Sequence, residues 1–435
     1  MSEQPEAVVG PSFAEARNAW ARIGLMSFGG PAGQIAMMHK VIVDEKRWLD
    51  EESFLLALNF CMLLPGPEAM QLATYTGWRL HGTRGGLAAG LLFVAPGALI
   101  ILLITILYAN FGSVPLVSAL FGGIKAAVLA IVVEALLRIA GRSLKGWTEW
   151  LIAAFSFVAI FLIKIPFPLI VLAAAVIGFG KTLLQAPREV APLPAMAAVP
   201  IVTTLKTVSI WVAVWTLPLA AIALLFGFEH VLAQLAAFFS KLAVVTFGGA
   251  YASLAYMAQA VVETYRWLKP GEMLDGLGLA ETTPGPLILV NEFVGYLAAA
   301  RHGGGSPLGF GVLGAVVTLW ATFAPSFLFV FAGAPYVERL KFAPRLKGAL
   351  SAIGAAVVGV IFNLSLWFSL HVFFRARTEL TLGPLRLEVP TLASIDFAAV
   401  ALAVLAAILL FVLRLGIVAT LGISAIASLM LGLFA

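Results

Sequence analysis

The sequence predicts an all-α integral membrane protein with about 13 transmembrane helices, arranged as two inverted-topology repeats that one extra helix joins. Three observations support this prediction: long apolar segments without charge, a duplicated set of motifs, and basic residues that gather in alternate loops. Hydrophobic residues occupy 61% of the 435 positions and charged residues only 11%. A soluble domain carries about a quarter charged residues, so we expect most of this chain to lie in lipid.

Seven segments are nearly free of charged residues, and several approach the ~20 residues that cross the ~30 Å hydrocarbon core. A helix on the surface of a soluble protein would instead carry a charged face at helical period. The N-terminal sequence has no basic segment followed by an apolar core, so we expect no cleaved signal peptide. The seven segments are 87–109, 151–163, 168–180, 208–226, 311–334, 349–370 and 397–413.

Composition also excludes several functions. Cys61 is the one cysteine, which excludes an internal disulfide and a cysteine-based metal cluster. The five histidines show no metal-ligand spacing, so we expect neither a metal site nor a cofactor. The net charge of +5 comes from scattered residues, so we predict no nucleic-acid partner. The chain lacks a GxxxxGKS or GxxxxGKT run, which argues against ATP-driven pumping, and the sequence predicts no enzyme.

Three motifs occur twice, at an offset of 219 residues. Segment 28–67 shares fourteen identical positions with segment 247–286, so we interpret the chain as a duplication. Ala95-Pro96 recurs at 324–325, at an offset of 229. We predict three parts: an N-terminal repeat at 1–190, a linker with one helix at 191–229, and a C-terminal repeat at 230–435. The duplicated motifs are Phe28-Gly29-Gly30 with Phe247-Gly248-Gly249, Arg47-Trp48-Leu49 with Arg266-Trp267-Leu268, and Pro65-Gly66-Pro67 with Pro284-Gly285-Pro286.

Loop charges predict that the two copies are inverted. Loop 110–116 carries no charge, whereas its counterpart 334–347 carries Arg339, Lys341, Arg345 and Lys347. Because basic loops stay in the cytoplasm, equivalent loops lie on opposite sides of the membrane. The single apolar segment 207–227 between the copies inverts the second one. We expect an inner-membrane protein of the bacterial type, with its N-terminus in the cytoplasm and its C-terminus outside.

The duplicated motifs interrupt the apolar pattern, which points to a binding site. Gly29-Gly30-Pro31 and Pro65-Gly66-Pro67 break short apolar pieces between 12 and 81. Broken backbone at membrane depth survives only against protein or a water-filled cavity, and such breaks in matching places mark transport sites. A helix that restarts at Pro31 or Pro67 presents free amides to an oxyanion. The alternative is that these glycines and prolines only permit close packing and kinks.

Ionisable residues in apolar surroundings are further candidates, because such groups are costly in a membrane. Glu281 and Glu292 flank the second Pro-Gly-Pro motif where the first copy has Met62 and Ala73, so either is a candidate for proton coupling. For Glu68 the alternative is capping of a helix N-terminus, and for Lys125 it is a side chain that reaches the membrane interface.

Six segments carry a resemblance to a known family: FGGPAGQIAMM, RWLD, PGPEAMQLATYTGW, HGTRGGLAAGLLFVAPG, TFGGAYASLAYM and TTPGPLIL. With these the chain resembles the chromate ion transporter (CHR) family in its long, two-domain form. The resemblance implies a carrier that exports chromate, is driven by the membrane potential or a proton gradient, and meets sulfate as a competitor or exchange partner. A carrier of sulfate or another tetraoxyanion and a gated anion channel remain the alternatives.

The motifs, their basic neighbours and the resemblance together define a predicted oxyanion site. The membrane lipid and the chromate or sulfate ion are the expected partners. Glycines in 86–90 and 305–309 could serve helix contacts either within one chain or between the two chains of a homodimer. The predicted binding residues are Arg22, Phe28, Gly29, Gly30, Pro31, Pro65, Gly66, Pro67, Glu68, Lys125, Lys241, Gly248, Gly249 and Gly285.

Overall fold

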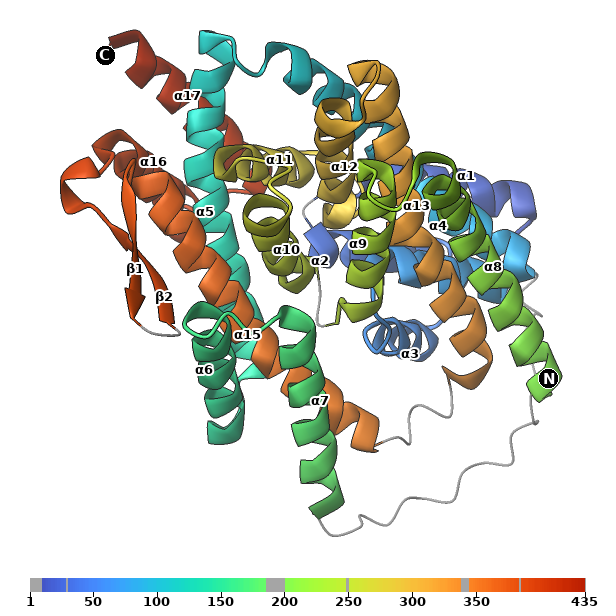
Figure 1. Cartoon of the computed structure of the whole chain (residues 1–435). Helices are drawn as coiled ribbons and strands as arrows, with labels where there is room; N and C mark the ends of the chain where they lie inside the picture. The colour runs from blue at the N-terminus through green and yellow to red at the C-terminus, as the bar shows by residue number, and fades with distance from the viewer. Residues whose placement is uncertain are drawn as a thin grey trace.

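The computed structural model of the chain describes residues 10–28, 30–184, 200–247, 250–337, 344–382 and 385–434 (Figure 1). The prediction of a helical protein is confirmed for most of these ranges. The α-helices are α1 (Phe13–Met26), α2 (Gly30–His39), α3 (Glu51–Cys61), α4 (Glu68–Phe111), α5 (Pro115–Ser143), α6 (Trp147–Phe161), α7 (Phe167–Leu184), α8 (Ile201–Phe226), α9 (Val231–Val245), α10 (Ala250–Gln259), α11 (Pro270–Thr282), α12 (Val290–His302), α13 (Pro307–Gly333), α15 (Pro344–Phe373), α16 (Phe397–Ala407) and α17 (Ile417–Phe434).

One hairpin departs from the predicted all-α fold. Strands β1 (Arg377–Leu382) and β2 (Leu385–Pro390) pair antiparallel, with Leu380 opposite Leu387. Polar and apolar residues alternate along both strands, which is the strand pattern that a search for apolar spans overlooks. The hairpin follows α15, in the connection to α16.

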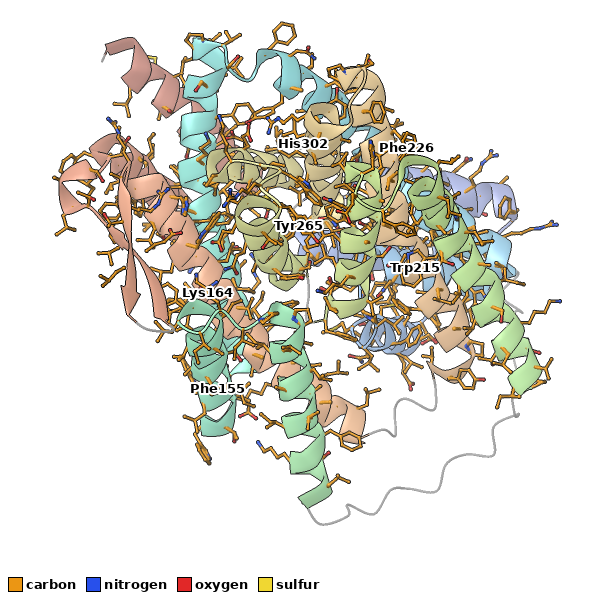
Figure 2. The ribbon with its side chains drawn as sticks, in the orientation of Figure 1. Phe155, Lys164, Trp215, Phe226, Tyr265 and His302 are labelled. Carbon is orange, nitrogen blue, oxygen red and sulfur yellow. The ribbon has the colours of Figure 1, made fainter. Side chains whose placement is uncertain are left out.

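Five helices are long and apolar enough to cross a membrane: α4, α5, α8, α15 and the segment Pro307–Tyr336 that contains α13. Shorter apolar helices surround them, among them α6, α7, α9, α16 and α17. On α8 the apolar side chains face outward, and Leu225 is 79% exposed. Phe155 on α6 is likewise 65% exposed (Figure 2). Apolar surface on this scale fits a protein surrounded by lipid, whereas the total of about 13 spans stays a prediction.

The helices repeat in the same order in the two halves. Helices α1, α2 and α3 correspond to α9, α10 and α11, and α5, α6 and α7 correspond to α15, α16 and α17. Helix α4 is two helices joined at His81 and Gly82, where the backbone is not helical, and these two parts correspond to α12 and α13. Helix α5 begins at Pro115 and α15 begins at Pro344, so the offset of 229 also relates this helix pair. Within the described ranges, helix α8 has no counterpart.

Two equivalent helices run in opposite directions in Figure 1. Helix α5 begins at the top of the view and ends lower down, whereas α15 runs upward beside it. Helices α6 and α7 lie in the lower part of the view, and α16 and α17 lie in the upper part.

Backbone details repeat as well. Arg47 and Arg266 both have positive φ, at 52° and 54°. The residue after each arginine donates its amide at 2.8 Å to a carbonyl six positions earlier, Trp48 to Ile42 and Trp267 to Val261. Such a wide turn follows a short π-helical segment in both copies, Lys40–Glu45 and Ala260–Thr264. The duplication therefore extends from sequence to local conformation.

The small residues of 86–90 pack inside the chain. A Cβ atom on Gly86 would lie 2.6 Å from the Phe331 ring, and one on Gly90 would lie 2.4 Å from Thr74 Oγ1. The glycines thus allow the two parts of α4 and helix α13 to approach closely. This explains them without contacts between two chains.

Candidate binding site

The two Pro-Gly-Pro turns join the copies reciprocally. Gly66 donates its amide to the carbonyl of Thr246 at 2.9 Å, and Gly285 donates to the carbonyl of Ser27 at 2.9 Å. Both glycines have positive φ, 113° and 92°, a conformation that a residue with a Cβ atom rarely adopts. Each turn is therefore anchored to the Phe-Gly-Gly break of the other copy.

The helices restart at these breaks, as the motifs predict. Helix α2 begins at Gly30, one residue before Pro31, and α4 begins at Glu68, directly after Pro67. In the second copy α10 begins at Ala250, the counterpart of Pro31. Each restart leaves amides without an intrahelical partner and places partial positive charge at the break.

A cavity of about 730 Å³ lies where these helix starts meet. Its wall comes from α2, α3, the start of α4, the end of α5, and the starts of α10 and α15. The volume is in the range of ~300–1,000 Å³ that small-molecule sites occupy. Its polar and charged wall residues are Glu52, Asn59, Glu68, Arg138, Arg142, Ser143, Tyr251, Lys347 and Ser351.

Three cationic side chains line this cavity: Arg138, Arg142 and Lys347. Arg138 is committed to Glu134, one turn earlier on α5, because its Nε donates to Glu134 Oε1 at 3.1 Å. Arg142 makes no hydrogen bond or ion pair with the residues that the structure describes. A guanidinium presents two parallel N–H donors that match two oxygens of an oxyanion, so Arg142 has the chemistry to bind one.

A buried carboxylate lies behind the cavity wall. Tyr251, which lines the cavity, donates its hydroxyl to Glu281 Oε1 at 2.7 Å. Glu281 is 5% exposed, and its second oxygen has no partner among the described residues. The cavity is thus connected to Glu281 through one hydroxyl group.

Some predicted residues meet at this cavity. Pro31 and Glu68 line it. Pro65, Gly66 and Pro67 are buried directly before Glu68, and Gly30 opens α2 beside Pro31. Gly285 holds the second Pro-Gly-Pro turn against Ser27. Gly29, Gly248 and Gly249 lie outside the described residues.

Other predicted residues lie elsewhere. Arg22 pairs with Glu45 at 3.3 Å, and the Lys241 ammonium lies 5.9 Å from the centre of the Tyr256 ring. Lys125 pairs with Asp275 at 3.3 Å. None of these three cations is among the cavity-lining residues, since each is taken by a partner on another element.

Two further predictions fall outside the cavity wall. Phe28 is 44% exposed and does not line the cavity. Glu292 is 1% exposed, and its Oε2 atom has no partner among the described residues. Of the two candidates for proton coupling, Glu281 is therefore the one connected to the cavity by a hydrogen bond.

Sequence reasoning did not include Arg138, Arg142, Lys347 or Tyr251 in the site. The basic residues were used only to assign sides to loops. A signal was present, because Arg138 and Arg142 are four residues apart and hence on one face of the same helix. Tyr251 carried no comparable signal.

The long apolar helices define a polytopic integral membrane protein, and the cavity between them carries charged side chains on a largely apolar wall. The chromate transporter family model matches residues 15–179 and 233–430, on either side of α8. The chain therefore belongs to the chromate transporter family.

Characterised and uncharacterised relatives match most of the chain. It is 33% identical to a chromate transport protein of Pseudomonas aeruginosa over 82% of this chain and 81% of the relative. It is 28% identical to a chromate transport protein of Cupriavidus metallidurans over 78% of each. An uncharacterized transporter of Methanocaldococcus jannaschii is 27% identical over 83% of this chain and 86% of the relative. No solved structure matches the chain.

Proposed function

We propose that the protein is a secondary active carrier that exports chromate and binds it in the cavity. The observation that carries this proposal is the meeting, at one cavity, of helix starts from both copies with the uncommitted guanidinium of Arg142. The names of the relatives from Pseudomonas aeruginosa and Cupriavidus metallidurans support chromate as the substrate. Sulfate, which has the same shape and charge, is the expected competitor or exchange partner.

Electrostatics explains how the cavity holds a doubly charged tetraoxyanion reversibly. Arg142 offers paired N–H donors, and the first turns of α2 and α10 add partial positive charge. Glu52 and Glu68 on the same wall repel the anion. A carrier needs this balance, because a site that binds too tightly does not release its substrate.

We further propose that the cavity opens to the cytoplasm. Arg138 and Arg142 lie at the end of α5 that precedes the basic loop residue Lys145, and Lys347 lies at the start of α15. The positive-inside rule assigns such a cluster to the cytoplasmic side. The opposed directions of α5 and α15 support the inverted repeat, and the gap in the family match around α8 supports the boundaries 1–190, 191–229 and 230–435.

Glu281 is our candidate for proton coupling. Protonation of this carboxylate would change the charge behind Tyr251 and so the affinity of the cavity for an anion, through one hydrogen bond. In this scheme proton and oxyanion influence each other without sharing a ligand. Such coupling requires that each changes the binding of the other to the same extent.

Uptake of labelled chromate into inverted membrane vesicles tests the function. We expect saturable uptake that sulfate inhibits and that falls when the proton gradient is collapsed. Loss of a hydrogen bond to a charged group costs about 1.5–3 kcal/mol, so Arg142→Gln should weaken chromate uptake about 10- to 100-fold. Arg22→Gln is the matched control, because Arg22 lies outside the cavity and pairs with Glu45.

The same vesicles separate the alternatives. Ohmic chromate current without saturation would indicate a gated channel. Sulfate uptake that chromate does not inhibit would indicate a carrier for another tetraoxyanion. Equal uptake by Arg142→Gln and Arg22→Gln would exclude this cavity as the substrate site.

A further inference from the structure

A second polar cluster lies apart from the cavity, between α4, α5 and α11. Tyr108 donates its hydroxyl to Asp275 Oδ2 at 2.7 Å, and Lys125 Nζ lies 3.3 Å from the same oxygen. Asp275 is 3% exposed, and its other oxygen has no partner among the described residues. We call Tyr108, Lys125 and Asp275 the polar lock, because together they tie three helices to one carboxylate.

The repeat assigns each residue of the polar lock a counterpart in the other copy. At the offset of 219 Asp275 corresponds to Leu56, and at the offset of 229 Tyr108 corresponds to Val337. Lys125 corresponds by the same offset of 229 to Gly354. Leu56, Val337 and Gly354 all line the cavity.

The helices that carry these residues are in contact on one side and apart on the other. A Cβ atom built on Gly278 of α11 would lie 3.7 Å from Ile124 Cβ of α5. The counterparts of Gly278 and Ile124 are Asn59 on α3 and Ile353 on α15. Between α3 and α15 lies the cavity, with Asn59 on its wall. Figure 1 has α11 in the upper part of the view and α3 in the lower part.

We propose that the polar lock is the outer gate of the transport path, closed while the cavity is open, and that it opens when α3 closes on α15. This inference rests on the proposed carrier function. A carrier built from inverted repeats exposes its site to one side at a time, because the two copies exchange conformations. Here one copy has the contact between its helices and the other has the cavity, which is the asymmetry that such an exchange requires.

The chemistry of the polar lock suits a gate. Asp275 is buried while Lys125 is partly exposed, so a carboxylate that loses this partner is left buried without a counter-charge, and the closed state has a defined geometry. Opening would release Lys125 from Asp275 and present a cation toward the exit. An oxyanion leaving the cavity would meet this charge in place of the carboxylate.

A disulfide between α5 and α11 tests the gate. In a chain with Cys61→Ala, the substitutions Ile124→Cys and Gly278→Cys place two Cβ positions 3.7 Å apart, within the ~3.5–4.5 Å typical of disulfides. The replacement of Ile124 also removes the methyl group that crowds Gly278. We expect oxidation to stop chromate transport, and reduction of the disulfide followed by removal of the reductant, which would itself reduce chromate, to restore it. Chromate binding to the detergent-solubilised protein should persist, because the cavity stays open.

The counterpart pair provides the matched comparison. Asn59→Cys with Ile353→Cys should cross-link slowly in the resting protein and faster during turnover, since the cavity lies between α3 and α15. If oxidation of the variant with Ile124→Cys and Gly278→Cys leaves chromate transport unchanged, the proposed gate is wrong. If the variant binds no chromate in either its reduced or its oxidised form, the cavity as the substrate site is in question. The experiment therefore separates failure of the proposed site from failure of the proposed gate.

Discussion

The interface between α5 and α11 and the interface between α3 and α15 are two versions of one arrangement, and three of the side chains that differ between them distinguish a closed from an open interface. The first has Tyr108, Lys125 and Asp275, whereas the second has Val337, Gly354 and Leu56. Long polar groups fill the first interface and connect its helices. Small and apolar groups leave the second open. A duplicated scaffold can thus close one end of a path with an ion pair and the other with apolar contact.

The largest expected effect comes from moving the ion pair into the cavity. Leu56→Asp with Gly354→Lys should connect α3 to α15 as Asp275 and Lys125 connect α11 to α5. We expect chromate binding and transport to fall to background, because the cavity wall would pair with itself. Leu56→Asn with Gly354→Ala is the control without charges. Normal chromate uptake by the charged double variant would show that the two interfaces are not equivalent.

Loss of charge from the polar lock should open the outer side. Asp275→Asn removes the charge that pairs with the partly exposed Lys125, so it should favour the open gate. In a chain with Cys61→Ala and Ile124→Cys, the rate of labelling by an impermeant maleimide from outside should rise about tenfold or more. Glu272→Gln is the matched control on the same helix, because it breaks the more exposed pair with Arg301. Equal labelling of both variants would contradict a gate at Asp275.

The reciprocal turns that join the copies should be sensitive to a single methyl group. Gly66 has a φ of 113° and a Cβ atom there would lie 2.8 Å from Ser326 Oγ, whereas Gly82 has a φ of 60° and open space. Strained backbone costs about 1–3 kcal/mol, and the contact adds to it at Gly66 alone. Gly66→Ala should therefore melt several degrees below Gly82→Ala in detergent. Equal melting temperatures would show that the turn at Gly66 is not held by its surroundings.

The smallest effect is expected at Tyr108. Tyr108→Phe removes one hydrogen bond to Asp275 and leaves the Lys125 pair in place. A bond to a charged group contributes about 1.5–3 kcal/mol, less than the buried ion pair, so labelling of Ile124→Cys should rise less than with Asp275→Asn. A larger rise than with Asp275→Asn would mean that the hydroxyl, and not the ion pair, holds the gate.

Much of the fold followed from local patterns. Apolar segments, Gly/Pro breaks and the duplicated motifs each depend on a few neighbouring residues, and the helices begin and end close to where they predict. The hairpin at 377–390 was missed because its alternating pattern is short and lies in a loop. The inversion of the copies and the membrane orientation, both inferred from the charge pattern, stay predictions.

The site was less accessible to sequence reasoning, because its parts come from six helices. Pro31 and Glu68 were found through the helix restarts that they mark. Lys125 was chosen as a charge in an apolar segment, yet the fold commits it to Asp275, 150 positions later in the chain. Nothing local distinguishes such a cation from Arg142, which faces the cavity without a partner among the described residues.

By itself, the sequence determined a membrane protein of the chromate transporter family, its duplication and the positions of its backbone breaks. These are properties of composition and of short motifs, since apolar length and Gly/Pro placement act locally. Only the tertiary structure decided which cations meet at the cavity and which are paired. It alone also revealed that one of two equivalent helix pairs is closed around Asp275 and the other is open around Leu56. Pairing and packing depend on the distances between helices, which no single segment of the chain contains.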